Sequence, residues 1–526
     1  MKHLLYKKLT VLQVLAIAVV SLMILFFTNF FYFNIDPSYK KNAQVKKDSV
    51  VVKDTIVKRD TSSFGNLKYA LDTLTAKTEL THAGFGFCLM SPDSGRIILE
   101  YNSKQSLVPA SVMKTLSCGT ALAKLGAGFR YVTRLQYDGE IDKATHTLNG
   151  NIYIMGNGDP SLASDVFGEN ATENLMKQWT AAIKQLGIDS VNGSIVGDAS
   201  LFEQDLIPVG WSWEDMQSNY AVGPCGLSFR ENMYDIKVSA SEKGVYFRSS
   251  PPVPGLILHN QLFWNKAIAK SYLYVSGAPY QEERTLLGEV NGAFEDRSAV
   301  PDPALYCAYT LMKHLQKNNL KIKDSCSTVL KLKFANKYFK KERKTFHSTY
   351  SPSLAQLVYH TLQVSQNFYA ETFLRTLALA DGGFGSTASG VAAVIHFFKE
   401  KKIDLHGFFM VDGSGVSRYD AISTKFLCDM LTAYSKDSSM FKTFYDALPV
   451  AGESGTMRNI ANETSAAGNI HAKSGYMSRV RSYAGYVHTK SGKMLVFAMI
   501  MNNQGWEANE TRDRLEKMMV LMAELK

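Results

Sequence analysis

The spacing of hydrophobic and polar positions predicts a chain of both helices and strands. Helical spacing recurs in five segments, namely residues 66–80, 115–125, 353–380 (one helix or two), 425–435 and 508–525. Alternating apolar positions on either side of short turns predict two hairpins, over residues 84–101 and 482–501. Between about 135 and 340 many short alternating runs follow one another, as in 148–155 and 191–196, and they indicate a β-rich region.

The longest apolar run lies near the N-terminus, at residues 11–33. It is long enough to cross a bilayer, which takes about 20 residues. A cleaved signal peptide is the alternative, but its apolar part is usually shorter and ends in small residues. This run ends in aromatic side chains, from Phe30 to Phe33. We therefore expect an uncleaved single-pass anchor in the cell membrane, with a periplasmic or otherwise extracytoplasmic body.

Composition places the chain among ordinary globular proteins. Of the 526 residues 46% are hydrophobic and 20% are charged, and the length favours more than one domain. Much of the net charge of +10 comes from lysines on both sides of the apolar run, as expected for residues that flank a membrane segment. Because no nucleic-acid-binding motif accompanies this charge, we expect no nucleic-acid partner. The six cysteines are scattered without a CxxC pair, so we expect buried free thiols and no metal site.

A serine and a lysine three positions apart, Ser111 and Lys114, open the predicted helix 115–125. Side chains at this spacing lie on the same face of a helix. A serine hydroxyl needs an adjacent base to become a nucleophile, and a lysine can be that base when burial lowers its pKa. A second such pair, Ser439 and Lys442, lies in a polar segment and is interpreted as a surface feature.

Two further motifs carry chemistry. In Ser365-Gln366-Asn367 the hydroxyl can relay a proton and the amide of Asn367 can hold a substrate amide. In the segment 473–476, Lys473 and the Ser474 hydroxyl can bind a carboxylate, and Gly475 lets a substrate backbone approach. The N–H of Tyr476 can join that of Ser111 in an oxyanion hole. Similar triplets at 190–192 and 490–492 lie in predicted turns and are interpreted as structural.

The order SxxK, SxN, KSG is that of β-lactamases and penicillin-binding proteins. Over residues 66–524 the chain resembles the D-alanyl-D-alanine carboxypeptidase/endopeptidase family, the low-molecular-mass class C penicillin-binding proteins (peptidase family S13). The supporting stretches are PASVMK at 109–114, GNGDPS at 156–161, GWSW at 210–213, NFYAE at 367–371, DGSGVSR at 412–418 and LPVAG at 448–452. Two motifs depart from the family pattern: Gln366 replaces an aspartate, and Ser474 and Tyr476 replace threonines.

The resemblance implies an α+β fold. A transpeptidase/β-lactamase-like domain, with an antiparallel sheet flanked by helices, would carry β-rich inserted domains. The expected parts are a cytoplasmic tip and anchor at 1–35, a lysine-rich linker at 36–64, catalytic segments at 65–134 and 345–526, and the inserted domains at 135–344.

The resemblance also implies a serine-type D-Ala-D-Ala carboxypeptidase, DD-endopeptidase or both, a hydrolase that acts on peptidoglycan peptides of the cell wall and is inhibited covalently by β-lactam antibiotics. No metal or organic cofactor would be needed. The expected roles are nucleophile for Ser111, base for Lys114, proton relay for Ser365, and substrate binding for Asn367, Lys473, Ser474, Gly475 and Tyr476. A β-lactamase, which shares the motifs, and a catalytically inactive peptidoglycan-binding scaffold protein are the alternatives.

Overall fold

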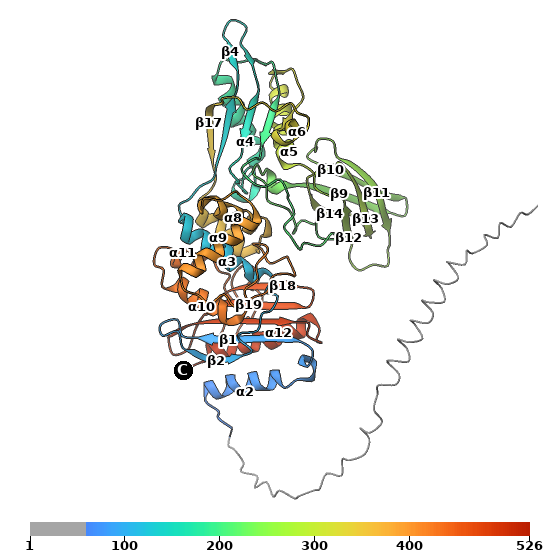
Figure 1. Ribbon diagram of the computed structural model, residues 1–526. Coiled ribbons are helices and arrows are strands. Elements are labelled where there is room, and N and C mark those ends of the chain that lie inside the picture. The colour runs from blue at the N-terminus through green and yellow to red at the C-terminus, as the bar shows by residue number, and fades with distance from the viewer. Residues whose placement is uncertain (1–58) are drawn as a thin grey trace, which may run out of the picture. The chain divides into compact units, whose positions relative to one another are not determined.

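The structure is a computed structural model that describes residues 59–526 (Figure 1). The apolar run at 11–33 and nearly all of the predicted linker lie outside these residues. No helix within 59–526 is long and apolar enough to cross a membrane. The longest, α12 (Ala508–Ala523), has 16 residues against the roughly 20 that a bilayer requires. This finding contradicts the expected localisation as a single-pass membrane protein.

A five-stranded antiparallel sheet joins the two ends of the described chain. Its strands are β1 (Gly84–Met90), β2 (Ile97–Tyr101), β18 (Ile470–Met477), β19 (Val480–His488) and β20 (Met494–Asn502), in the order β18-β19-β20-β1-β2. Strand β1 pairs with β20 from Gly84 opposite Asn502 to Met90 opposite Val496. Both predicted hairpins, β1–β2 and β19–β20, belong to this sheet, and β18 forms one of its edges.

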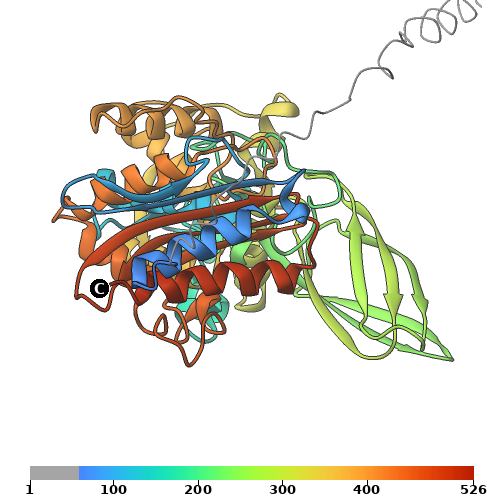
Figure 2. The same ribbon diagram turned by 90° about the horizontal axis from the view of Figure 1, so that it is seen from below.

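Helices cover both faces of the sheet. Helices α2 (Ser63–Thr75) and α12 lie across the outer face (Figure 2), where Leu67, Leu71 and Leu74 bury one side of α2. The other face packs on a layer of helices, namely α3 (Lys114–Leu125), α7 (Leu354–Val364), α8 (Asn367–Ala380), α9 (Thr387–Glu400), α10 (Thr424–Ser435) and α11 (Phe441–Ala447). The expected α+β fold, with a sheet flanked by helices, is confirmed. The predicted segment 353–380 is two helices, which separate at Ser365 and Gln366.

Between α3 and α7 the chain forms four further sheets, two of three strands, one of four and one of five (Figure 1). Their strands are β3 (Val132–Tyr137), β4 (Glu140–Asp142), β5 (Thr147–Asn149), β6 (Ile152–Met155), β7 (Ser190–Val191), β8 (Ile195–Asp198), β9 (Met233–Ser241), β10 (Gly244–Ser250), β11 (Ile257–Trp264), β12 (Tyr272–Ser276), β13 (Glu283–Val290), β14 (Phe294–Ala299), β15 (Lys321–Ile322), β16 (Ser327–Thr328) and β17 (Lys344–Tyr350). Three helices that were not predicted accompany them, α4 (Ala171–Gln185), α5 (Pro303–Lys317) and α6 (Val329–Phe334). The region is rich in strands, as expected, and its division into domains stays a prediction.

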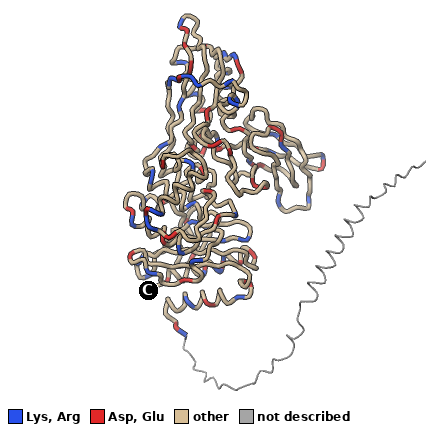
Figure 3. The backbone as a smooth tube through the Cα atoms, viewed as in Figure 1, with Lys and Arg blue, Asp and Glu red and all other residues tan. Residues whose placement is uncertain are grey.

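Acidic and basic residues are interspersed along the described chain (Figure 3). The six cysteines all lie in this part of the chain as free thiols, and all but Cys326 are buried.

Candidate active site

Ser111 lies in a short 3-10 helix, Ala110–Met113, that leads directly into α3. Lys114 is the first residue of α3, and its Nζ atom lies 2.8 Å from Oγ of Ser111. The first turns of α3 are buried throughout, and the side chain of Lys114 is 0% exposed. The structure therefore brings the predicted nucleophile and the predicted base into direct contact, and it removes the base from water.

Burial gives Lys114 the electrostatics that a base requires. Loss of hydration lowers its pKa to about 8, and the nearby Asp412 carboxylate contributes the largest charge that opposes this shift. The Nζ atom also donates a 2.8 Å hydrogen bond to the backbone carbonyl of Ser414. A lysine in this environment can give up and take a proton near neutral pH.

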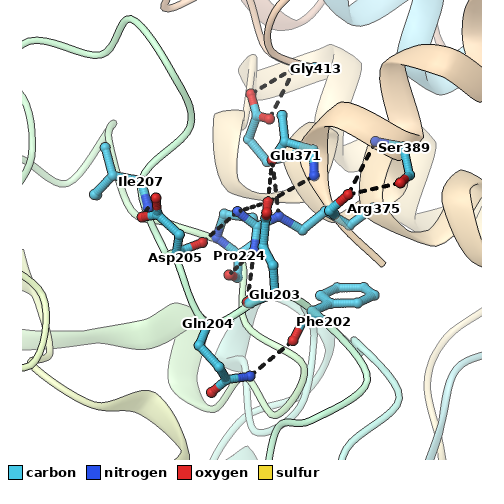
Figure 4. Close-up of polar contacts among 12 residues, drawn as sticks. Phe202, Glu203, Gln204, Asp205, Ile207, Pro224, Glu371, Arg375, Ser389 and Gly413 are labelled. Atoms are coloured by element: carbon cyan, nitrogen blue, oxygen red, sulfur yellow. Dashed lines mark hydrogen bonds and ion pairs between the residues drawn. The ribbon is translucent and has the colours of Figure 1, made fainter. Parts of the chain in front are cut away.

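The acidic residues around Lys114 were not predicted as site residues. Glu371, on α8, accepts from the Gly413 N–H with both carboxylate oxygens at 3.0 Å (Figure 4). Asp412 is fully buried and accepts from the N–H groups of Gly415, at 2.6 Å, and Ser417, at 2.7 Å. Burial and the neighbouring Asp412 raise the pKa of Glu371 to about 8. The two residues lie in stretches 367–371 and 412–418, which supported the family resemblance, but neither has a sequence context that indicates a buried acid.

Lys473 lies on the edge strand β18 and is also fully buried. Burial and the positive charge of Lys114 hold its pKa well below the usual lysine value. Its Nζ atom donates to the carbonyl of Ser474 at 2.7 Å, and the Ser474 hydroxyl lies 2.8 Å from that of Thr456. A positive charge on Lys114 therefore disfavours a second positive charge on Lys473.

Gly475 allows β18 to pass close to the helix start that carries Ser111. A Cβ atom at this position would lie 2.7 Å from the carbonyl oxygen of Pro109 and 3.1 Å from the backbone N of Ser111. No side chain fits in that space, so glycine is required here. The next residue, Tyr476, is 60% exposed, and the guanidinium of Arg481 lies 4.5 Å from its ring centre. The close approach agrees with an oxyanion hole formed by the N–H groups of Ser111 and Tyr476, which stays a prediction.

Ser365 and Asn367 lie at the junction between α7 and α8. Ser365 ends α7 in the left-handed conformation, with φ of 61°, and is half-buried. Asn367 opens α8, and its side-chain amide donates to the carbonyl of Tyr220 at 2.6 Å while its Oδ1 is buried without a partner among the described residues. No hydrogen bond within residues 59–526 joins Ser365 to Ser111 or Lys114. Its predicted relay role thus lacks a direct contact.

The similar motifs lie elsewhere. The Ser439 hydroxyl donates to Asp437, and Lys442 pairs with Asp446 on an exposed surface. The triplet 490–492 lies in the turn between β19 and β20, and Ser190 lies in β7. None of them contacts the Ser111–Lys114 pair.

A sheet covered by helices, a Ser-x-x-Lys pair at the start of a buried helix and a Lys-Ser-Gly edge strand are together typical of serine hydrolases of the penicillin-binding class. The chain belongs to the D-Ala-D-Ala carboxypeptidase 3 (S13) family, which it matches over residues 67–525. It is therefore an enzyme of the serine D-Ala-D-Ala carboxypeptidase class, and the predicted family is confirmed.

Relatives support this assignment over most of the chain. A penicillin-sensitive carboxypeptidase A of Dictyostelium discoideum is 24% identical over 477 residues, which cover 82% of this chain and 85% of the relative. The D-alanyl-D-alanine carboxypeptidase DacB of Haemophilus influenzae is 23% identical over 435 residues, covering 79% of this chain and 85% of the relative. The crystal structure of penicillin binding protein 4 (dacB) from Haemophilus influenzae superposes with a TM-score of 0.73 at 20% identity. It covers 86% of this chain and 97% of that one, and this likeness shows the shared fold.

Proposed function

We propose that the chain is a serine D-Ala-D-Ala carboxypeptidase, DD-endopeptidase or both, that cleaves peptidoglycan stem peptides through an acyl-enzyme on Ser111. One observation carries the proposal, the 2.8 Å contact between Ser111 Oγ and Nζ of a fully buried lysine whose pKa is about 8. Burial makes Lys114 a base near neutral pH, and the contact directs that base at the hydroxyl.

Acylation follows from this contact. Neutral Lys114 takes the Ser111 proton while Oγ attacks the carbonyl carbon of the penultimate D-Ala. The oxyanion accepts hydrogen bonds from the N–H groups of Ser111 and Tyr476. The C–N bond then breaks, the proton held by Lys114 is delivered through the Ser365 hydroxyl to the leaving amine, and the amine departs as free D-Ala or as the second peptide of a cross-link. Water then attacks the ester carbonyl while Lys114 takes its proton. That proton passes to Ser111 Oγ as the ester bond breaks, which restores Ser111 and the neutral base. A β-lactam acylates Ser111 in the same way.

Substrate capture depends on charge at Lys473. Within the described residues buried Lys473 forms no ion pair, so its charged form lacks a counter-charge and its pKa is lowered. A substrate carboxylate would supply that counter-charge, and the Ser474 hydroxyl would add a hydrogen bond. The unpartnered Oδ1 of Asn367 would accept from a substrate amide N–H. We also propose that the segment between α3 and α7 is an insertion into the catalytic domain.

Hydrolysis of an acyl-tripeptide that ends in D-Ala-D-Ala tests the proposal. The unchanged chain should release one D-Ala per peptide, and Ser111→Ala should release none. Ser439→Ala is the matched control and should retain full activity. Rapid turnover of penicillin without release of D-Ala would instead indicate a β-lactamase, and binding of the peptide without either reaction would indicate an inactive scaffold.

A further inference from the structure

A segment of the inserted region reaches the turn that holds Lys114. The connection between β8 and β9 carries Trp211, whose indole Nε1–H donates a 2.9 Å hydrogen bond to Oδ2 of Asp412. Trp211 is 6% exposed and Asp412 is 0% exposed, so water does not compete for this bond. The preceding residue touches the same turn, because a Cβ atom on Gly210 would lie 2.3 Å from the Ser417 hydroxyl.

Asp412 in turn organises the backbone around the base. Its Oδ1 accepts from the Gly415 N–H, and its Oδ2 accepts from the Ser417 N–H as well as from the indole. The carbonyl of Ser414, enclosed by these bonds, accepts the hydrogen bond from Lys114. Three contacts of 2.9 Å or less therefore run from Trp211 to Asp412, from Asp412 to the turn, and from the turn to Lys114.

The same part of the insertion is fixed to α8. Arg375 forms an ion pair with Glu203 at 3.0 Å and donates to the carbonyl of Asp205 at 2.8 Å (Figure 4). One turn earlier on the same helix, Glu371 holds the Gly413 N–H. Helix α8 therefore anchors both the inserted segment and the 412–417 turn. This shared anchor fixes the position of the Trp211 indole relative to Asp412.

We propose that Trp211 is a positioning residue for Lys114 that acts through Asp412. This inference rests on the acyl transfer proposed above. A buried carboxylate keeps one orientation only while its hydrogen-bond donors are present. Without the indole N–H, Oδ2 of Asp412 keeps only the Ser417 N–H, so the carboxylate can tilt, the Ser414 carbonyl shifts with the turn, and Nζ of Lys114 moves relative to Ser111 Oγ. A misplacement of about 1 Å in a reacting group lowers a rate by as much as about 10²-fold.

The insertion offers a matched control. Trp179, on α4, is also buried, and its Nε1–H also donates a 2.9 Å hydrogen bond, but to the Thr349 hydroxyl. The variants Trp211→Phe and Trp179→Phe each remove one indole hydrogen bond from the full chain. Both should lower the thermal stability, Trp211→Phe by more because its partner is a buried carboxylate, and only Trp211→Phe should slow acylation.

Acylation by a fluorescent penicillin can be followed by stopped flow over a range of penicillin concentrations. The dependence on concentration separates the limiting acylation rate from the apparent dissociation constant. Trp211→Phe should lower the limiting rate by about 10- to 100-fold and leave the dissociation constant unchanged. If Trp211→Phe does not fold, β-(3-benzothienyl)alanine at position 211 removes the N–H and keeps the ring shape. A limiting rate equal to that of Trp179→Phe would overturn the inference.

A double-mutant cycle with Asp412→Asn tests whether Trp211 acts through Asp412. The double variant should acylate no more slowly than Asp412→Asn alone, because the indole then has no carboxylate to hold. If the two substitutions lowered the acylation rate additively, Trp211 would act independently of Asp412. That result would refute the inference on Trp211 and leave the proposed function standing. Failure of the unchanged chain to acylate at all would refute the proposed function, and this inference with it.

Discussion

The limiting rate of Ser111 acylation by penicillin should rise steeply with pH and level off near pH 8. Burial lowers the pKa of Lys114 from 10.5 to about 8. At pH 7 about one molecule in ten then holds Lys114 as the neutral base, against about one in three thousand for an unperturbed lysine. The site therefore gains about 300-fold in reactive base at neutral pH.

The sign of the dependence follows from which form reacts. The neutral amine accepts the proton, so the rate should increase about tenfold per pH unit below about pH 7 and become constant above about pH 9. Asp412→Asn removes the negative charge that most strongly raises the pKa of Lys114, so the rise should move to lower pH even though the plateau also falls. Stopped-flow measurement of the limiting acylation rate between about pH 5.5 and pH 9.5, for the unchanged chain and for Asp412→Asn, tests this pH dependence. A rate that is flat over this range, or a rise that moves to higher pH in Asp412→Asn, would refute the reasoning.

Two further substitutions test the substrate strand. Gly475→Ala would place a Cβ atom 2.2 Å from the Ser482 hydroxyl, so it should destabilise the fold by about 1–3 kcal/mol and slow acylation, as measured by thermal unfolding and penicillin labelling. Gly128→Ala, which has no atom within 4 Å of its Cβ position, is the control and should change neither. Lys473→Ala should weaken capture of a free-acid D-Ala-D-Ala peptide more than that of its amide in single-turnover acylation, whereas Lys490→Ala should affect neither. An equal loss for both peptides would place Lys473 in proton transfer instead.

The parts of the site that depend on short-range geometry could be predicted from the sequence. A spacing of three residues at the start of a helix is enough to place Ser111 beside Lys114. The turn residues at 490–492 and the polar surroundings of Ser439 were likewise sufficient to set those motifs aside. The family motif placed Lys473 in the predicted site, because no local sequence pattern shows that β18 lies next to Ser111.

The residues that tune Lys114 could not be found in this way. Asp412 and its glycine-rich neighbours have the composition of an ordinary exposed turn, and only the tertiary fold buries them. Glu371 is one polar residue in the apolar helix α8, and Trp211 is about 200 positions from the carboxylate that it contacts. Helices α4 and α5 were missed because short alternating runs on both sides favoured strands throughout that region.

The mass of the full chain after incubation with penicillin tests the central claim most directly. We predict an increase by one penicillin molecule, located by peptide mapping on Ser111, with no adduct on Ser111→Ala and an undiminished adduct on Ser439→Ala. An adduct on Ser111→Ala, or a modified residue other than Ser111 in the unchanged chain, would contradict the assignment of Ser111 as the nucleophile.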